Sequence, residues 1–119
     1  MKEIRFAWVC RNIHFNNIER VELTDTMLLS GARPSWITSP NCEVLAKILP
    51  TGFFDKNNKE IWEGDIVQWD KKSYPVFWSN KMNQYLLGVS EACMVMLRAR
   101  SPYYAVIGNI WEAQKTEEL

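Results

Sequence analysis

The feature that most constrains this chain is a stretch of turn-forming residues between Thr51 and Val67. Gly52 and Gly64 lie near its two ends, and each can take a positive φ without steric cost, so each predicts a sharp change of direction. Between them, residues 55–59 read Asp-Lys-Asn-Asn-Lys. Asp and Asn hydrogen-bond their own backbone and tolerate the left-handed region. The stretch therefore predicts two strands joined by a turn, followed by a second corner.

The second corner is Glu63-Gly64-Asp65, and it precedes the run Ile66-Val67-Gln68-Trp69. A β-branched and aromatic run is typical of a strand. Since Asp65 begins that strand after a glycine, we expect its carboxylate to accept hydrogen bonds from backbone N–H groups in the turn. The alternative is an acid–base pair of Glu63 and Asp65. We favour the structural interpretation, because no residue adjacent in sequence completes a catalytic set.

Length and charge narrow the class of protein. The chain has 119 residues, which is one domain's worth, and 47% of them are hydrophobic, which predicts a buried core. Fourteen basic and fourteen acidic residues leave a formal net charge of zero. A strongly basic face that would bind nucleic acid is therefore not expected. Because the net charge is zero, two copies of the chain do not repel each other overall.

In the first half of the chain, the alternation of apolar residues predicts a strand over residues 4–11. Short strands are predicted over 13–15 and 21–23, with an Asn-rich turn between them. Residues 43–49 predict a strand that ends at Pro50, and a short helix is the alternative.

Residues 24–42 are predicted to be irregular, because Gly, Pro and Asn repeatedly break regular structure there. Five apolar residues interrupt the segment: Met27, Leu28, Leu29, Trp36 and Ile37. We expect them to anchor the segment to the core, and an exposed binding loop is the alternative.

In the second half, residues 74–78 and 84–89 predict a hairpin, and 93–98 form a further apolar run. Residues 103–111 predict the last strand, with a bulge or a close backbone approach at Gly108. Many short strands separated by turns predict an all-β fold, a small barrel or sandwich of short antiparallel strands. We expect a single domain over residues 1–112 and a polar, frayed tail over 113–119.

The central block resembles the YopX family of small phage and prophage proteins. The matching positions are Thr51, Gly52, Asp55, Asn57, Lys59, Glu60, Ile61, Glu63, Gly64, Asp65, Ile66 and Val67. Phe53, Asn58 and Trp62 stand where the family pattern has Leu, Gly and Tyr. The runs Ile4–Trp8 and Val106–Glu112 are similar to the opening and closing motifs of the family, and the latter includes Gly108 and Asn109.

This resemblance implies a mainly-β fold and a phage-related origin, and it implies no activity. A Gly-Asp corner that opens a core strand is also similar to small SH3-like barrels, so part of the chain is expected to be such a barrel by analogy alone.

Signatures of catalysis and metal binding are missing from the sequence. It has no phosphate-binding loop, no nucleophile elbow and no Cys-x-x-Cys pair. Cys10, Cys42 and Cys93 are far apart and odd in number, which indicates buried free thiols in a reducing cytosol rather than a disulfide framework or zinc site. The single histidine, His14, is interpreted as structural. We therefore expect no enzyme activity, no cofactor and no metal.

Six tryptophans are many for this length: Trp8, Trp36, Trp62, Trp69, Trp78 and Trp111. We interpret them as core or interface residues. The alternative is a platform on which single-stranded bases stack, but Trp62 and Trp69 are each followed by an acidic residue rather than by Lys or Arg.

The resulting hypothesis is an accessory protein that binds another protein or itself, either as a homo-oligomer or with a phage or host protein. The alternative is a nucleic-acid-binding module of the small β-barrel type. The sequence has no apolar run of the length of a membrane span, so a cytoplasmic protein with no membrane partner is expected.

Overall fold

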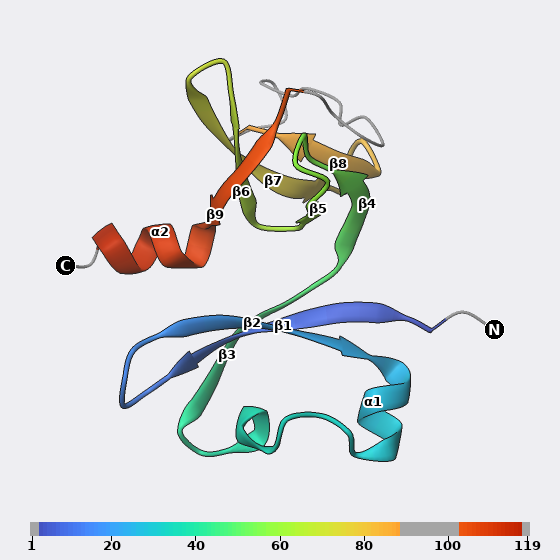
Figure 1. Ribbon diagram of the computed structural model, residues 1–119, viewed down its shortest axis with the longest axis vertical. Coiled ribbons are helices and arrows are strands. Elements are labelled where there is room, and N and C mark those ends of the chain that lie inside the picture. Colours follow the sequence, from blue (N-terminus) through green and yellow to red (C-terminus); the bar gives the residue numbers. More distant parts are fainter. Residues whose placement is uncertain (1–2, 89–102, 118–119) are drawn as a thin grey trace. The chain divides into compact units, whose positions relative to one another are not determined.

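The computed structural model describes residues 3–88 and 103–117, and the chain divides into two compact units, Met1–Leu49 and Pro50–Leu119 (Figure 1). Each unit has its own antiparallel sheet and its own buried cluster of side chains. The apolar run predicted over 93–98 lies outside the described residues. The single domain predicted over residues 1–112 stays a prediction.

Unit 1 consists of β1 (Arg5–Asn12), β2 (Ile18–Thr24), α1 (Asp25–Ser30), η1 (Ser35–Thr38) and β3 (Cys42–Ile48). β1 is the central strand and pairs antiparallel with β2 on one side and β3 on the other. The register between β1 and β3 shifts between Val9 and Cys10, so the pair contains a β-bulge. The strand predicted over 43–49 is confirmed, in preference to the helix.

The predicted strand over residues 13–15 is wrong, because these residues form the turn between β1 and β2. The side chain of Asn12 ends the strand: its Oδ1 accepts the backbone N–H groups of His14 at 2.9 Å and Phe15 at 3.0 Å. Asn16 then takes a left-handed φ of 55°, a conformation that Asn tolerates. The hydrogen bonds to the Asn12 side chain thus favour a turn, although the apolar pattern of these residues predicts a strand.

The segment predicted as irregular contains two short helices that cover one face of the unit 1 sheet. Thr24 caps α1 by accepting the N–H of Met27, and Gly31 ends it with a φ of 79°. Ile37 of η1 is 2% exposed and joins a core cluster with Cys10 and Leu23.

The predicted anchoring by apolar residues is confirmed for three of the five and wrong for the others. Met27, Leu28 and Ile37 pack in the cluster, whereas Leu29 is 89% exposed and Trp36 is 39% exposed.

Unit 2 contains the elements β4 (Pro50–Phe54), β5 (Glu60–Trp62), β6 (Asp65–Trp69), β7 (Lys72–Ser79), β8 (Gln84–Leu87), β9 (Ala105–Asn109) and α2 (Ile110–Glu117). β4 and β5 form a hairpin, and the other strands form an antiparallel sheet in the order β8-β7-β6-β9. The predicted β7–β8 hairpin is confirmed. So is the bulge at Gly108, since the register between β6 and β9 shifts next to this residue.

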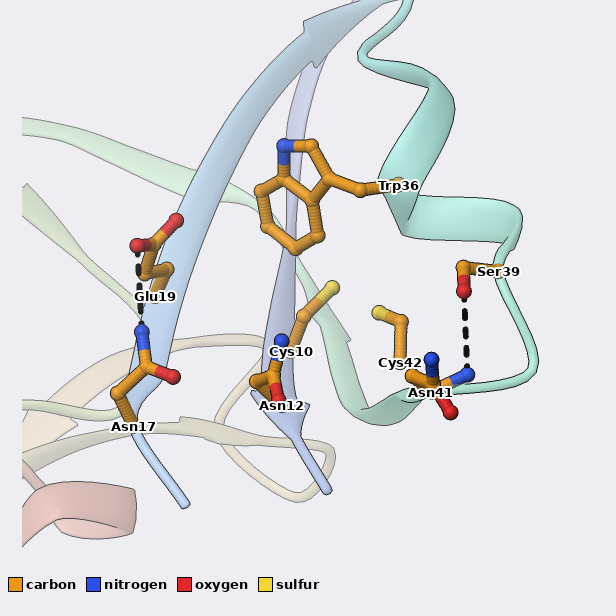
Figure 2. Close-up of a pocket in the computed structure, with 8 residues that line it drawn as sticks. All are labelled: Cys10, Asn12, Asn17, Glu19, Trp36, Ser39, Asn41 and Cys42. Atoms are coloured by element: carbon orange, nitrogen blue, oxygen red, sulfur yellow. Dashed lines mark hydrogen bonds between the residues drawn. The ribbon is translucent and has the colours of Figure 1, made fainter. Parts of the chain in front are cut away.

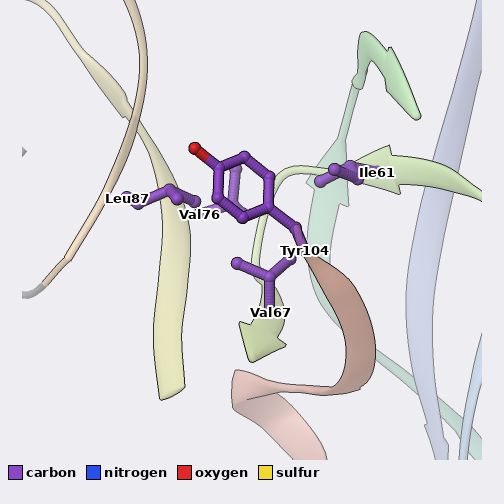
Figure 3. Close-up of a cluster of buried hydrophobic side chains, with 5 residues drawn as sticks. All are labelled: Ile61, Val67, Val76, Leu87 and Tyr104. Atoms are coloured by element: carbon purple, nitrogen blue, oxygen red, sulfur yellow. The ribbon is translucent and has the colours of Figure 1, made fainter. Parts of the chain in front are cut away.

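The core of unit 2 is formed by one buried residue from each of β5, β6, β7 and β8 and by Tyr104, which directly precedes β9: Ile61, Val67, Val76, Leu87 and Tyr104 (Figure 3). Trp69 packs against this cluster, and its ring meets the Tyr104 ring edge-on at a centroid distance of 5.9 Å. The mainly-β class predicted from the sequence is confirmed. Among the described residues the strands form three separate antiparallel sheets, and none of these sheets closes into a barrel.

The prediction for the C-terminal region is wrong in two respects. The last strand ends at Asn109 rather than at residue 111, and α2 occupies residues expected to be a frayed tail. The side-chain oxygen of Asn109 accepts the N–H of Glu112 at 2.9 Å, which satisfies a free donor of the first helical turn. This helix start outweighs the β-propensity of Ile110 and Trp111.

Candidate functional site

The block of residues 51–67, which resembles the family pattern, lies in unit 2 and forms a set of turns that buried side chains stabilise. Asp55 is 1% exposed, and its Oδ1 accepts the backbone N–H groups of Asn57 at 2.9 Å and Lys59 at 2.8 Å. Its Oδ2 accepts the N–H of Val106 at 2.9 Å. Asn58 takes the left-handed φ of 63° that the turn requires. One carboxylate thus shapes the β4–β5 turn and ties it to β9.

The Glu63-Gly64-Asp65 corner is braced in a similar way. The Oδ2 atom of Asp65 accepts the N–H of Trp62 at 2.8 Å, so the predicted bond from the turn is present and the side chain is buried. Gly64 has a φ of 87°, donates its N–H to Val76 and accepts the N–H of Ile110. The Trp111 ring lies directly over the Gly64 Cα, where a β-carbon would overlap it.

The other matched positions lie around these two turns. Thr51 Oγ1 donates to the Ile61 carbonyl at 2.7 Å, which links β4 to β5, and Gly52 has a φ of 82°. Glu60 pairs with Phe54 across the same hairpin. Ile61 is fully buried, Gly108 pairs with Ile66 and Asn109 caps α2.

The negative charge of Glu63 affects the protonation of a tyrosine on β8. Burial, followed by the negative charge of Glu63, raises the pKa of the Tyr85 hydroxyl above its ordinary value of 10.0. The charge of Glu63 therefore acts on Tyr85 of β8, whereas Asp65 directs its Oδ2 atom at the N–H of Trp62.

Unit 1 contains a pocket of about 350 Å³ that sequence reasoning missed (Figure 2). Its lining residues are Cys10, Asn12, Asn17, Glu19, Trp36, Ser39, Asn41 and Cys42. They come from β1, β2, η1, β3 and the loops between them. Polar side chains line one part of the pocket, and the Trp36 ring lies beside the two cysteines (Figure 2).

Cys10 and Cys42 are brought together in this pocket. Both are free, with Cys10 buried and Cys42 half-buried, and their sulfur atoms point toward one another (Figure 2). Burial, the neighbouring Cys42 thiol and the charge of Glu19 together raise the pKa of the Cys10 thiol from 9.0 to about 12. The two residues are 32 positions apart, and their meeting depends on the bulged register of β1 and β3, which no sequence pattern indicates.

The tip of the β1–β2 hairpin exposes two large apolar side chains, with Phe15 81% exposed and Ile13 57% exposed. Hydrogen bonds hold this tip in shape. Besides the two bonds to the Asn12 side chain, Asn16 N–H donates to the Asn12 carbonyl at 2.7 Å and Ile13 N–H donates to Asn41 at 2.9 Å. Phe15 therefore projects from an ordered turn.

These features define a mainly-β protein of antiparallel sheets, in which buried carboxylates brace the turns. A family model described as YopX protein matches residues 2–115, nearly the whole chain, so the chain belongs to the YopX family. None of the curated proteins matches it. Across residues 3–88 and 103–117, no helix is long and apolar enough to cross a membrane.

Proposed function

We propose that this YopX-family chain is a non-catalytic interaction module that associates with a second copy of itself through the tip of the β1–β2 hairpin. The observation that carries the proposal is the 81% exposure of Phe15 on an ordered turn. Phenylalanine buries a large apolar area when it enters an interface. Because the turn is already held by hydrogen bonds, little conformational freedom is lost on association.

The edges of the unit 1 sheet support the tip as the point of contact. β2 and β3 are the edge strands, and each presents exposed charged side chains, such as Glu19 and Glu22 on β2 and Lys47 on β3. Charges on an edge strand oppose pairing with a strand of another copy. The formal net charge of zero leaves no overall repulsion between two copies.

The roles of the matched turns agree with a scaffold rather than a catalyst. Asp55 and Asp65 direct their carboxylate oxygens at backbone N–H groups of unit 2, which is how turns are stabilised. Free thiols at Cys10 and Cys42 fit a reducing compartment such as a cytoplasm. The phage-related origin stays a prediction.

Sedimentation velocity of the full chain over a range of concentrations tests this proposal. We expect a concentration-dependent dimer, and we expect Phe15→Ser to weaken it by at least about tenfold, because a two-fold contact loses the ring from both copies. The matched control is Leu29→Ser, which removes an apolar side chain that is 89% exposed on α1. It should leave the association unchanged.

The proposal fails if the parent chain is a monomer at every concentration, or if Leu29→Ser and Phe15→Ser weaken the dimer equally. Thermal unfolding of both variants checks the fold, and both should melt within a few degrees of the parent, because an exposed side chain contributes little to stability.

A further inference from the structure

Cys10 and Cys42 lie on the same face of the unit 1 sheet at diagonal positions. Cys10 of β1 is opposite Val44 of β3, and Cys42 is opposite Asn12, two residues along each strand. Figure 2 shows the two sulfur atoms pointing toward one another inside the pocket. The pair is therefore two thiols aimed at one point, contributed by neighbouring strands.

The two free thiols converge on one point in the pocket, where a single metal ion would contact both sulfur atoms (Figure 2). Over the described ranges, no group of three or more His, Cys, Asp or Glu side chains could hold a metal ion. Two cysteines are too few for a tetrahedral zinc site, which needs four ligands, but they are enough for an ion that binds two ligands.

We propose that Cys10 and Cys42 form a two-thiolate site for a soft monovalent cation of the Cu(I) class. Thiolates are the ligands that such ions prefer, and a d10 monovalent ion accepts two of them in a linear arrangement. Binding releases one proton from each thiol: Cu(I) and two thiols give a bis-thiolate complex with a single negative charge and two protons. The oxidation state does not change, so no oxidant or reductant is required.

The surroundings of the pair shape both access and affinity. Cys42 is half-buried, which leaves a path from the solvent, while Cys10 is 1% exposed and shielded. Trp36 provides an aromatic wall on the same side of the pocket (Figure 2).

Glu19 is the charged group that opposes the complex. It lines the pocket, and its charge is among the causes that raise the pKa of Cys10. Arg11 and Glu43, which form an ion pair with each other, each lie one residue from a cysteine and so on the opposite face. Since the complex carries a negative charge, removal of the Glu19 charge should strengthen binding.

The test is an anaerobic titration of the full chain with Cu(I) against a chromogenic Cu(I) chelator, in a Cys93→Ser background. We expect one ion per chain with a new thiolate-to-metal absorption band. Cys42→Ser should remove the site, and because this residue is half-buried, the variant should keep its fold by circular dichroism. Val44→Ser, a polar substitution two residues along β3, is the matched control and should bind like the parent.

Two further measurements distinguish binding at the Cys10–Cys42 pair from nonspecific binding of the ion. Binding should tighten with rising pH, because protons are released, and Glu19→Gln should bind a few-fold more tightly than the parent at one pH. Equal binding by Cys42→Ser and the parent, or no ion retained against the chelator, would overturn the proposal. So would weaker binding by Glu19→Gln.

Discussion

At the scale of single residues, the most buried polar side chains of this chain stabilise turns. Asp55 and Asp65 are 1% and 2% exposed, and each accepts backbone N–H groups that would otherwise lie unpaired next to the core. A buried donor without an acceptor costs about 1–3 kcal/mol. The turns of unit 2 therefore depend on individual carboxylates, and single substitutions there should be costly.

Asp55→Ala should lower the free energy of unfolding by about 3 kcal/mol or more, because three backbone N–H groups lose their acceptor at once. Asp55→Asn keeps one acceptor oxygen and should lose less. Urea denaturation measures both values. Glu22→Ala, which removes an exposed carboxylate on β2, should change stability by less than about 0.5 kcal/mol. A loss for Asp55→Ala no larger than this control would contradict the assigned role.

Gly64→Ala and Gly52→Ala form a matched pair, since both glycines have a positive φ near 80–90°. A β-carbon at Gly64 would overlap the Trp111 ring, whereas one at Gly52 would meet nothing within 4 Å. Gly52→Ala should cost about 1 kcal/mol from backbone strain alone, and Gly64→Ala should cost clearly more. Thermal unfolding compares them. Adding Trp111→Leu should recover part of the Gly64→Ala loss, and a strictly additive double variant would argue against the contact.

The raised pKa of Cys10 predicts a pH effect. The thiol has a pKa of about 12 in the folded chain and an ordinary value of 9.0. Below pH 9 the thiol is protonated in both states and its contribution to stability is complete. Above pH 9 the unfolded state loses the proton while the folded state keeps it, so stability falls by up to about 1.4 kcal/mol per pH unit.

Urea denaturation under reducing conditions, from about pH 8 to pH 11, should show this loss in the parent chain. Cys10→Ala should be less stable at neutral pH, because a buried side chain is lost, but its stability should fall less with pH. The Tyr85 hydroxyl, whose pKa is also raised, titrates in both proteins and cancels in the comparison. Parallel pH profiles would show that the Cys10 thiol is not the source.

At the scale of elements, β9 and α2 form one continuous segment, because β9 ends at Asn109 and α2 begins at the next residue, Ile110. Asn109 ends the strand and caps the helix with its side chain, and Gly64 accepts the N–H of Ile110 just beyond it. The helix is only eight residues long, which is too short to be stable by itself in water. Its start therefore depends on the cap and on the contact of Trp111 with Gly64.

Asn109→Ala should cost about 1 kcal/mol and reduce the helical signal, because the first turn loses its acceptor. Asn109→Asp keeps a capping oxygen and should retain most of the stability. Circular dichroism at the helix wavelength and thermal unfolding measure both effects. Equal losses in the two variants would mean that Asn109 acts through something other than its capping oxygen.

At the scale of the whole molecule, the balance of charges separates the proposed self-association from binding to nucleic acid. With a net charge of zero, we expect no shift of single- or double-stranded DNA or RNA at micromolar protein and low salt in native gels. A shift that weakens steeply with salt would favour the alternative of a nucleic-acid-binding module. The Phe15→Ser variant should behave like the parent in this assay.

The sequence by itself determined the features that depend on neighbouring residues. It predicted the β class, the turn over residues 55–59, the positive φ at Gly52 and Gly64, and the acceptor role of Asp65, because turn chemistry acts within a few positions. It also carried an overlooked helix signal at Asn109, whose spacing to Glu112 is that of a capping pair.

Only the tertiary structure decided which distant residues meet. Asp55 reaches Val106, 51 residues away, and the Trp111 ring covers Gly64. The Cys10–Cys42 pair depends on a bulge that shifts the register of two strands. Such contacts are set by how sheets pair and pack, and a sequence pattern of period two specifies the face of a residue but not its partner on the next strand.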